Sequence, residues 1–253
     1  MTALDVLFDI RTGARTDTGR VRKLNEDNVA ALPDLGVWAV ADGMGGHSAG
    51  DVASRIIVEE LASLGVPVSA QDQRARVMER LERAHKRISF YALENDLKTV
   101  GATVAALLIY GGELTCIWAG DSRVYLWRKG ALTPLTTDHS EVAQMIAAGT
   151  MTEAEARTSP RRNVITRAIG IGPEPRPEMV SGALRHGDRL LLCSDGLTEH
   201  LNEDDLAEAL AQAQPAELLS EALVEETLAR GARDNVSVIV LDVAALPDAG
   251  IEE

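Results

Sequence analysis

Residues 37–43 read VWAVADG, an apolar run that ends in Asp42 and Gly43. Five apolar residues before an Asp-Gly pair are typical of a buried strand that leads into a turn. Asp42 is therefore expected at the end of a rigid element, where its carboxylate can be held in place for chemistry. An Asp-Gly pair on its own indicates no more than a turn, because it is the commonest hairpin signal.

Aspartates recur beside other predicted strand ends. They are Asp121 after the run 114–119, Asp195 after the run 190–194 and Asp234 before the run 236–241, while Asp27 follows the charged loop 22–26. Glycine follows Asp195 as it follows Asp42, and it leaves the backbone carbonyl accessible as a further oxygen ligand. All-oxygen ligands select Mg²⁺ or Mn²⁺ over zinc. The repetition predicts a metal cluster, although Asp121 alone could pair with Arg123 and Asp234 alone could cap a turn.

The remaining pattern predicts helices and strands in blocks. Amphipathic helices are predicted at residues 51–64, 72–93, 203–212 and 215–230, and strands at 7–14, 102–110, 114–119, 124–128, 131–135, 189–193 and 236–241. Residues 138–172 are polar, with one short helix near 141–148, and are interpreted as an inserted flap. This order favours helices layered outside antiparallel sheets. We expect one domain over residues 1–246 and an acidic tail at 247–253.

The composition narrows the classes of partner. The chain has 253 residues, of which 45% are hydrophobic, enough for one domain with a sizeable core. Its net charge of −14 disfavours nucleic acid and an anionic membrane surface, but not a phosphorylated substrate, because bound metal ions invert the local charge. Cys116 and Cys193 lie in apolar runs and are predicted to be buried free thiols. With no signal peptide and no apolar run of about 20 residues, a cytoplasmic protein is expected. No sizeable hydrophobic surface is predicted, so a monomer is expected.

Eight blocks of sequence carry a resemblance to a known family. They are residues 16–22 (TDTGRVR), 25–27 (NED), 39–47 (AVADGMGGH), 119–123 (AGDSR), 135–140 (LTTDHS), 163–170 (NVITRAIG), 191–197 (LLCSDGL) and 234–237 (DNVS). In this order they resemble the metal-dependent protein phosphatases of the PPM, or type 2C, class in their compact bacterial form. The resemblance covers residues 9–243, and the whole set is specific although any single block is not.

The resemblance implies a fold and a metal centre. The fold is α+β, a four-layer α/β/β/α sandwich of two central antiparallel sheets flanked by helix pairs, with a flap at about residues 138–172. Each active site of such proteins holds two Mn²⁺ or Mg²⁺ ions, and bacterial members hold a third, weaker one. Asp42 would bridge two ions and the Gly43 carbonyl would bind one of them. Asp195 and Asp234 would bind the other, and Asp121 would bind the third.

The resemblance also implies roles around the metals. Glu26 and Asp27 would orient metal-bound waters, and Arg22 would clamp the substrate phosphate with its planar fork of donors. Asn235 and Gly196 would support the site. A water or hydroxide bridging the two metals would attack phosphorus in line. Met44 stands where eukaryotic members have a histidine, so the general acid is either His47 or a metal-bound water.

The function implied is dephosphorylation of phosphoserine and phosphothreonine in proteins, opposing a serine/threonine kinase. Phosphorylated proteins, and that kinase among them, would be the partners. Two alternatives stay open. A non-catalytic regulator that binds phosphoproteins would have lost metal ligands, and none is missing here. A phosphatase of small phosphate esters is compatible with the same site, because the chemistry is centred on the phosphate.

Overall fold

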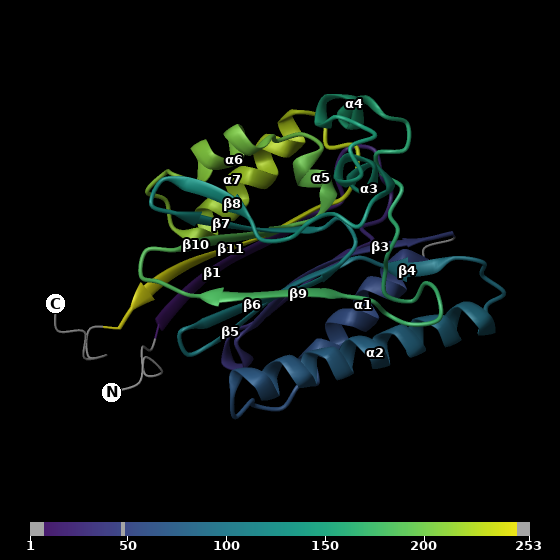
Figure 1. The fold of residues 1–253 in the computed structure, drawn as a ribbon, viewed down its shortest axis with the longest axis horizontal. Coiled ribbons are helices and arrows are strands. Elements are labelled where there is room, and N and C mark those ends of the chain that lie inside the picture. Colours follow the sequence, from purple (N-terminus) through teal and green to yellow (C-terminus); the bar gives the residue numbers. More distant parts are fainter. Residues whose placement is uncertain (1–7, 47–48, 247–253) are drawn as a thin grey trace.

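The computed structural model describes residues 8–46 and 49–246, and two antiparallel sheets form its centre. Helices cover the outer face of each sheet, so the layers run helix, sheet, sheet, helix (Figure 1). The predicted α+β sandwich of four layers is confirmed.

Each sheet is built from neighbours that run antiparallel. The first has the order β1 (Phe8–Asp17), β11 (Val236–Ala245), β10 (Arg189–Cys193), β7 (Arg123–Arg128) and β8 (Ala131–Pro134). The second has the order β2 (Asp27–Leu32), β3 (Val37–Gly45), β5 (Val104–Tyr110), β6 (Glu113–Ala119) and β9 (Glu178–Ala183), and β4 (Val100–Ala102) pairs with the end of β3.

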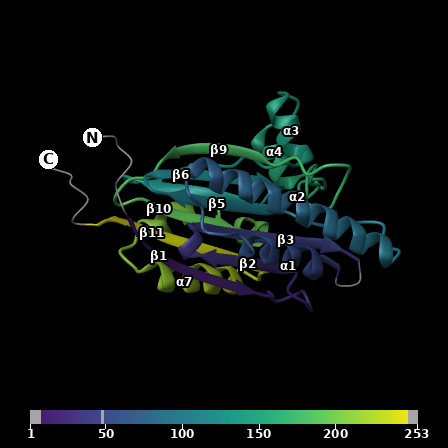
Figure 2. The same cartoon turned by 90° about the horizontal axis from the view of Figure 1, so that it is seen from below.

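The helices fall into two outer layers and the flap. On the second sheet lie α1 (Ala49–Ala62) and α2 (Ala70–Glu94), which Figure 2 shows side by side across the strands. On the first lie α5 (Asp195–Thr198), α6 (Glu203–Leu210) and α7 (Ala216–Ala229). The flap carries α3 (Glu141–Ala147) and α4 (Glu153–Thr158), and the 3₁₀ helix Pro33–Leu35 joins β2 to β3.

Strand β3 shows how the layers use the opening sequence. Val37, Ala39 and Ala41 face α1 and α2, whereas Trp38 and Val40 face the first sheet. Successive side chains of a strand point to opposite faces, and both faces of β3 are covered, which explains why this stretch is apolar throughout. A third apolar cluster lies under α6 and α7. Asp42 is thus the first charged side chain of the strand, directly after five buried residues.

The predicted turn at Asp42 and Gly43 is wrong. Strand β3 continues to Gly45, because Gly43 pairs with Ala102 of β4. The predicted strand 102–110 is divided at Thr103, and its first part supplies this extra partner. Asp42 is therefore held inside a strand and faces Asp27 of β2 in the register.

Other elements had no counterpart in the sequence prediction. Every residue of β9 is exposed, and β2 mixes polar residues with alanines, so neither shows an apolar alternation. The flap has a second helix, α4, which begins with a capping box between Thr152 and Glu155.

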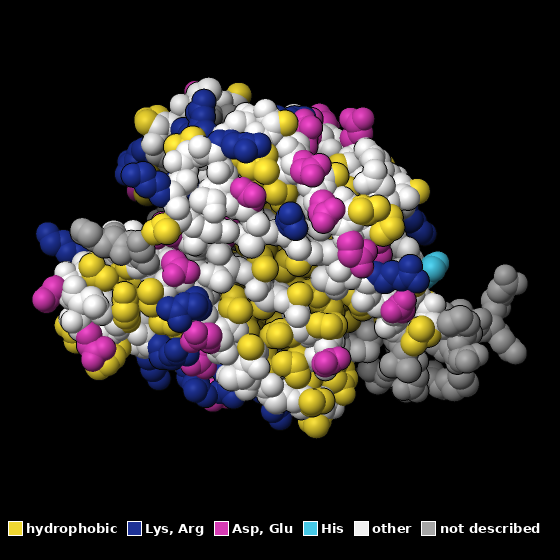
Figure 3. Space-filling view, turned by 180° about the vertical axis from the view of Figure 1, so that it is seen from behind, with side chains coloured by type: hydrophobic (Ala, Val, Ile, Leu, Met, Phe, Trp, Pro, Cys, Tyr) yellow, Lys and Arg dark blue, Asp and Glu magenta, His cyan; other side chains and the backbone are white. Residues whose placement is uncertain are grey.

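The surface adds two observations. Within the described part of the chain, no helix is long and apolar enough to cross a bilayer. Figure 3 shows apolar side chains gathered on the face seen from behind, and the loop before α2 leaves Val66 and Val68 exposed at 72% and 76%. The sequence argument for a monomer assumed that no such area exists, so the monomer stays a prediction.

Candidate active site

The predicted aspartates meet at one end of both sheets. Asp27 begins β2 and Asp42 lies opposite it in β3. Asp121 follows β6, on the side where Ala119 pairs with Val104 at the start of β5. In the other sheet, Asp195 follows β10, and Asp234 precedes β11, which is the antiparallel neighbour of β10. The sandwich therefore brings together carboxylates that are more than 200 residues apart in the chain.

The carboxylates of Asp42, Asp121, Asp195 and Asp234 at this end of the sheets are here called the aspartate rim, or the rim. Asp27 joins the two sheets beneath it. The residue is 4% exposed, and one carboxylate oxygen, Oδ2, accepts hydrogen bonds from the hydroxyls of Ser194 and Ser237, each at 2.7 Å. Both serines belong to the first sheet or its edge, whereas Asp27 belongs to the second. Burial raises the pKa of Asp27 to about 6, although the two serine hydroxyls oppose this shift. The contacts place Asp27 as a link under the site, with almost no surface exposed to solvent.

Thr103 fixes the backbone around Asp42. The Thr103 amide donates to the Asp42 carbonyl at 2.8 Å, and the Asp42 amide donates to Thr103 Oγ1 at 3.3 Å. The same hydroxyl lies 2.7 Å from the Ser122 hydroxyl, next to Asp121. One threonine therefore ties the two carboxylate-bearing segments together. The sequence prediction missed it, because a threonine between two apolar runs gives no signal of its own.

Gly43 and Gly196 lie where a side chain has no room. A Cβ at Gly43 would collide with the Gly50 carbonyl, and one at Gly196 would collide with the Asn235 carbonyl. The Gly43 amide donates to the Glu26 carbonyl at 3.0 Å, which leaves the strand end tightly packed. These contacts explain why glycine follows both Asp42 and Asp195.

Asp121 is not paired with Arg123. The Arg123 guanidinium instead binds both carboxylate oxygens of Asp138, at 2.8 and 2.7 Å, and donates to the Tyr125 hydroxyl. The alternative in which Asp121 serves only as an ion-pair partner of Arg123 is therefore wrong. Asp138 was not singled out from the sequence beyond its place at the start of the flap.

Arg22 lies next to Asp234 at the exposed side of the rim. Its Nη2 donates to Asp234 Oδ2 at 2.6 Å, and this hydrogen bond raises the pKa of Arg22. The two residues are 212 positions apart in the chain. The structure therefore brings the predicted phosphate-binding arginine to one of the predicted metal ligands.

Glu26 and Asn235 hold the loop that carries Arg22. Glu26 Oε1 accepts from the Gly50 amide at 3.2 Å, near the start of α1. Asn235 Oδ1 accepts from the Glu26 amide, and its Nδ2 donates to the carbonyls of Thr18 and Leu24. Asn235 thus holds the loop at Thr18, Leu24 and Glu26, while Glu26 Oε1 anchors the start of α1. His47 lies outside the described residues.

The negative charge on each rim carboxylate makes ionisation of its neighbours less favourable. Burial raises the pKa of Asp42 and Asp195 well above the usual value, and repulsion from neighbouring aspartates adds to the shift in both. Burial also raises the pKa of Asp121 to about 6, and Asp138 adds to it. A cation bound among these groups would remove the repulsion that raises their pKa values.

The donor set fits Mg²⁺ or Mn²⁺ in its chemistry. Among residues 8–46 and 49–246, no three acidic, histidine or cysteine side chains are arranged so that they could hold a metal ion by themselves. Mg²⁺ is usually bound through one or two carboxylates and keeps several waters, so such a trio is not required. Carboxylates together with the backbone carbonyl of Gly43 would give all-oxygen ligands, and both cysteines are buried in apolar clusters.

Most of the chain matches a known protein family. A family model described as Protein phosphatase 2C matches residues 19–230, which include every rim residue except Asp234. The chain belongs to the protein phosphatase 2C family. The resemblance found in the sequence is thereby confirmed, and the four-layer sandwich is the fold that its solved members share.

Individual members of the phosphatase 2C family show how far the likeness extends. PstP of Mycobacterium tuberculosis, a serine/threonine protein phosphatase, is 40% identical over 239 residues, which are 94% of this chain but 46% of PstP. The chain therefore spans about half the length of that relative. The serine/threonine phosphatase stp of Listeria monocytogenes is 32% identical, with 90% of this chain and 94% of stp covered. A crystal structure of the PstP catalytic domain in complex with two manganese ions has a TM-score of 0.85 and 37% identity, covering 94% of this chain and 100% of that one.

The flap is fastened to this phosphatase 2C scaffold through two buried histidines. The Thr166 amide donates to the His139 carbonyl at 2.6 Å, and the Gly170 amide donates to His85 Nδ1 at 3.1 Å. His139 Nδ1 also accepts from the Gly120 amide at 3.2 Å, directly before Asp121. Both imidazoles are buried, although the polar sequence around them gives no sign of this. Residues 163–170, here called the strap, are therefore fixed beside the rim.

Proposed function

We propose that this chain is a protein serine/threonine phosphatase that hydrolyses phosphoserine and phosphothreonine esters. The observation that carries the proposal is the rim where the half-buried Asp42, Asp121 and Asp195 lie together beside Arg22 and Asp234. Membership of the phosphatase 2C family supports it, as do the activities named for PstP and stp. We place the whole activity in one domain over residues 1–246, with 247–253 as a tail.

In this proposal the rim holds two Mn²⁺ or Mg²⁺ ions, and a third more weakly. Asp42, the Gly43 carbonyl, Asp195 and Asp234 would hold the two ions. Asp121 would hold the third with help from Asp195. The manganese ions named for the PstP catalytic domain support this choice of metal. When bound, the ions supply Lewis acidity and a water of lowered pKa that is nucleophilic at neutral pH.

The residues of the chain then bind and orient the phosphate. Arg22 neutralises Asp234 in the structure, and its planar donors become available to the phosphate oxygens once a cation takes over that carboxylate. Asp27 keeps the two sheets in register below the site through Ser194 and Ser237. Glu26 and Asp27 are proposed to orient waters around the ions. His47 is the proposed general acid, with a water as the competing donor.

The two alternatives differ from this proposal in their substrate. A non-catalytic phosphoprotein-binding regulator would bind a phosphopeptide without turning it over. A phosphatase of small esters would turn over p-nitrophenyl phosphate but not a phosphothreonine peptide. We prefer the protein phosphatase because the relatives that cover this chain are named for that activity.

The test is hydrolysis of p-nitrophenyl phosphate and of a phosphothreonine peptide with Mn²⁺, with Mg²⁺ and with EDTA. We expect turnover of both substrates with the metals and none in EDTA. Asp42→Asn should lower kcat/KM by about 100-fold or more, because even residues that only orient metal ligands cost 10–100-fold. Asp34→Asn is the matched control, since Asp34 is exposed in the turn at the opposite end of β2 and β3. Turnover that survives EDTA, or its complete absence in folded protein, would contradict the proposal.

Membership of the phosphatase 2C family also supports a more specific proposal about partners, location and oligomeric state. We infer that the substrates include targets of a serine/threonine kinase, or the kinase itself, and that the enzyme acts as a cytoplasmic monomer. Light scattering after size exclusion tests the oligomeric state, and a mass above that of one chain would contradict the monomer.

A further inference from the structure

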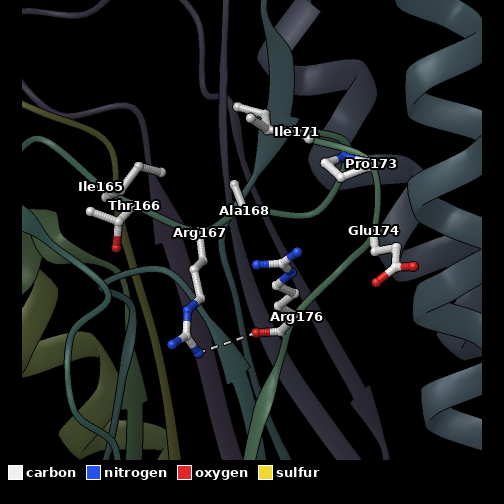
Figure 4. Close-up of a pocket in the computed structure, with 9 residues that line it drawn as sticks. Ile165, Thr166, Arg167, Ala168, Ile171, Pro173, Glu174 and Arg176 are labelled. Atoms are coloured by element: carbon white, nitrogen blue, oxygen red, sulfur yellow. Dashed lines mark hydrogen bonds between the residues drawn. The ribbon is translucent and has the colours of Figure 1, made fainter.

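A hollow of about 220 Å³ lies beside the strap, outside the aspartate rim (Figure 4). Thr166, Arg167 and Ala168 of the strap form one side, and Ile171, Pro173 and Arg176 form the other. Sites for small molecules usually measure about 300–1,000 Å³, so this hollow is too small for a nucleotide or a cofactor. Its size suits a single side chain of a larger partner.

The hollow is close to the rim. Ile169 of the strap pairs with Ala102, and Ala102 pairs with Gly43 in the strand register. Two strand spacings of about 4.8 Å put Ile169 roughly 10 Å from Gly43. An extended peptide covers that distance in about three residues. A protein with its phosphorylated residue at the rim would therefore reach the hollow with a residue about three positions away.

Arg167 fixes one wall of the hollow but has no spare charge. Its Nη1 donates to Glu178 Oε1 at 2.6 Å and to the Arg176 carbonyl at 3.5 Å, and it lies 3.3 Å from His139 Nε2. Glu178 therefore neutralises its charge. The contact with the Arg176 carbonyl, drawn as a dashed line in Figure 4, holds the backbone of Arg176 in place.

Arg176 is the cation left available in the hollow. It is exposed, and no acidic group of the described chain lies within ion-pair distance of it, as the ion pairs in this region involve only Arg161, Arg162 and Arg167. Pro175 and Pro177 flank it and restrict the backbone, which lowers the entropy cost of holding the side chain in place. In Figure 4 its guanidinium reaches toward Ala168, whereas the carboxylate of Glu174 points outward toward α2.

The charge around the hollow contrasts with the rest of the chain. Residues 157–176 contain five arginines and one glutamate, a net charge of +4 in a chain whose net charge is −14. Arg161, Arg162 and Arg167 are each paired with a glutamate, so Arg176 is the group of this segment that makes the hollow complementary to an acidic side chain.

We propose that Arg176 determines substrate specificity by binding an acidic side chain of the phosphoprotein, about three residues from the phosphorylated serine or threonine. The aliphatic part of the bound side chain packs on Ala168, Ile171 and Pro173, and its carboxylate pairs with the guanidinium. This inference rests on the proposed phosphatase function and names the class of protein substrate for it.

The test is a set of phosphothreonine peptides. Each peptide carries one glutamate, or one lysine, at a single position between four residues before the phosphothreonine and four residues after it. The wild type should prefer glutamate at one position, about three residues from the phosphothreonine. Its kcat/KM for that peptide should be about fivefold higher than for the other glutamate peptides, which is the upper range for an exposed ion pair. Arg176→Ala should remove that preference through KM and leave p-nitrophenyl phosphate unaffected. Arg176→Glu should reverse it in favour of lysine.

Arg185→Ala is the matched control, because Arg185 is exposed two residues after β9 as Arg176 is two residues before it. We expect it to behave as the wild type. Peptide hydrolysis without any register preference, or an equal loss in Arg185→Ala, would overturn this inference alone. Absence of hydrolysis of every substrate would overturn the proposed function and this inference with it.

Discussion

At the scale of single residues, the chemistry rests on carboxylates that the fold makes costly to ionise. Asp27 is the clearest case, because it is almost fully buried and its two described donors are neutral serine hydroxyls. Burial raises its pKa from 3.8 to about 6. Such a group is poorly suited to a purely structural role, since a neutral side chain would stabilise the fold more.

We expect the free energy of unfolding without divalent cations to fall as pH rises from about 4 to 6. In that window the folded chain keeps a proton on Asp27 that the unfolded chain has released, so deprotonation favours the unfolded state. The loss should be on the order of 2 kcal/mol for this residue. Asp27→Asn keeps the shape without a titratable proton and should flatten the slope, which urea denaturation in EDTA at several pH values measures.

Asp34→Asn is again the control and should keep the wild-type slope. A slope that is identical in Asp27→Asn and in the wild type would show that Asp27 does not titrate as described. Because Asp42, Asp121 and Asp195 also have raised pKa values, the slope should be reduced in Asp27→Asn and not abolished.

At the scale of elements, the sequence predicted the helices and strands that show apolar periodicity, but it did not predict strands that form only by pairing with a distant segment. The helix α2 was predicted to within about two residues, because its apolar side chains recur at a helical period. Strand β9 was missed because all its residues are exposed, and the extension of β3 was missed because it depends on β4, a partner 55 or more residues away in the sequence. Pairing of distant segments leaves no local signal.

The histidine that joins the flap to β6 gives a prediction at this scale. Burial lowers the pKa of His139, so its neutral ring accepts the Gly120 amide through Nδ1 while stacking on Trp118. His139→Ala should leave that amide without an acceptor and raise its hydrogen-exchange rate by about fivefold, since a hydrogen bond contributes about 1 kcal/mol. His139→Asn keeps an acceptor at the Nδ1 position and should restore most of the protection.

His186→Ala is the matched control for this exchange experiment. His186 Nδ1 accepts the Ala245 amide in the same way, but at the opposite end of β11 from Asp234. Its loss should leave the exchange of Gly120 unchanged. Equal protection of Gly120 in His139→Ala and in the wild type would contradict a role for His139 in fixing the segment before Asp121.

At the scale of the whole molecule, the site exists only because two sheets end together. The predictions that rested on repeated aspartates at strand ends could name Asp42, Asp121, Asp195 and Asp234, and the structure brings all four to one rim. The sequence could not show that Ser194 and Ser237 would bind Asp27 across the sheets, because that contact spans 167 and 210 positions. Thr103 and Arg176 were missed for the same reason, since their roles come from neighbours in space.

The most direct test of the central claim is to count bound Mn²⁺ by isothermal titration calorimetry near pH 7.5. The account predicts two tight ions per wild-type chain with a weaker third, and loss of tight binding in Asp42→Asn with Asp34→Asn unchanged. Saturation at about 100 times the dissociation constant should also stabilise the fold by about 2.7 kcal/mol. A wild-type chain that binds no Mn²⁺, or an Asp42→Asn chain that binds as many ions as the wild type, would contradict the assignment of the aspartate rim as the metal centre.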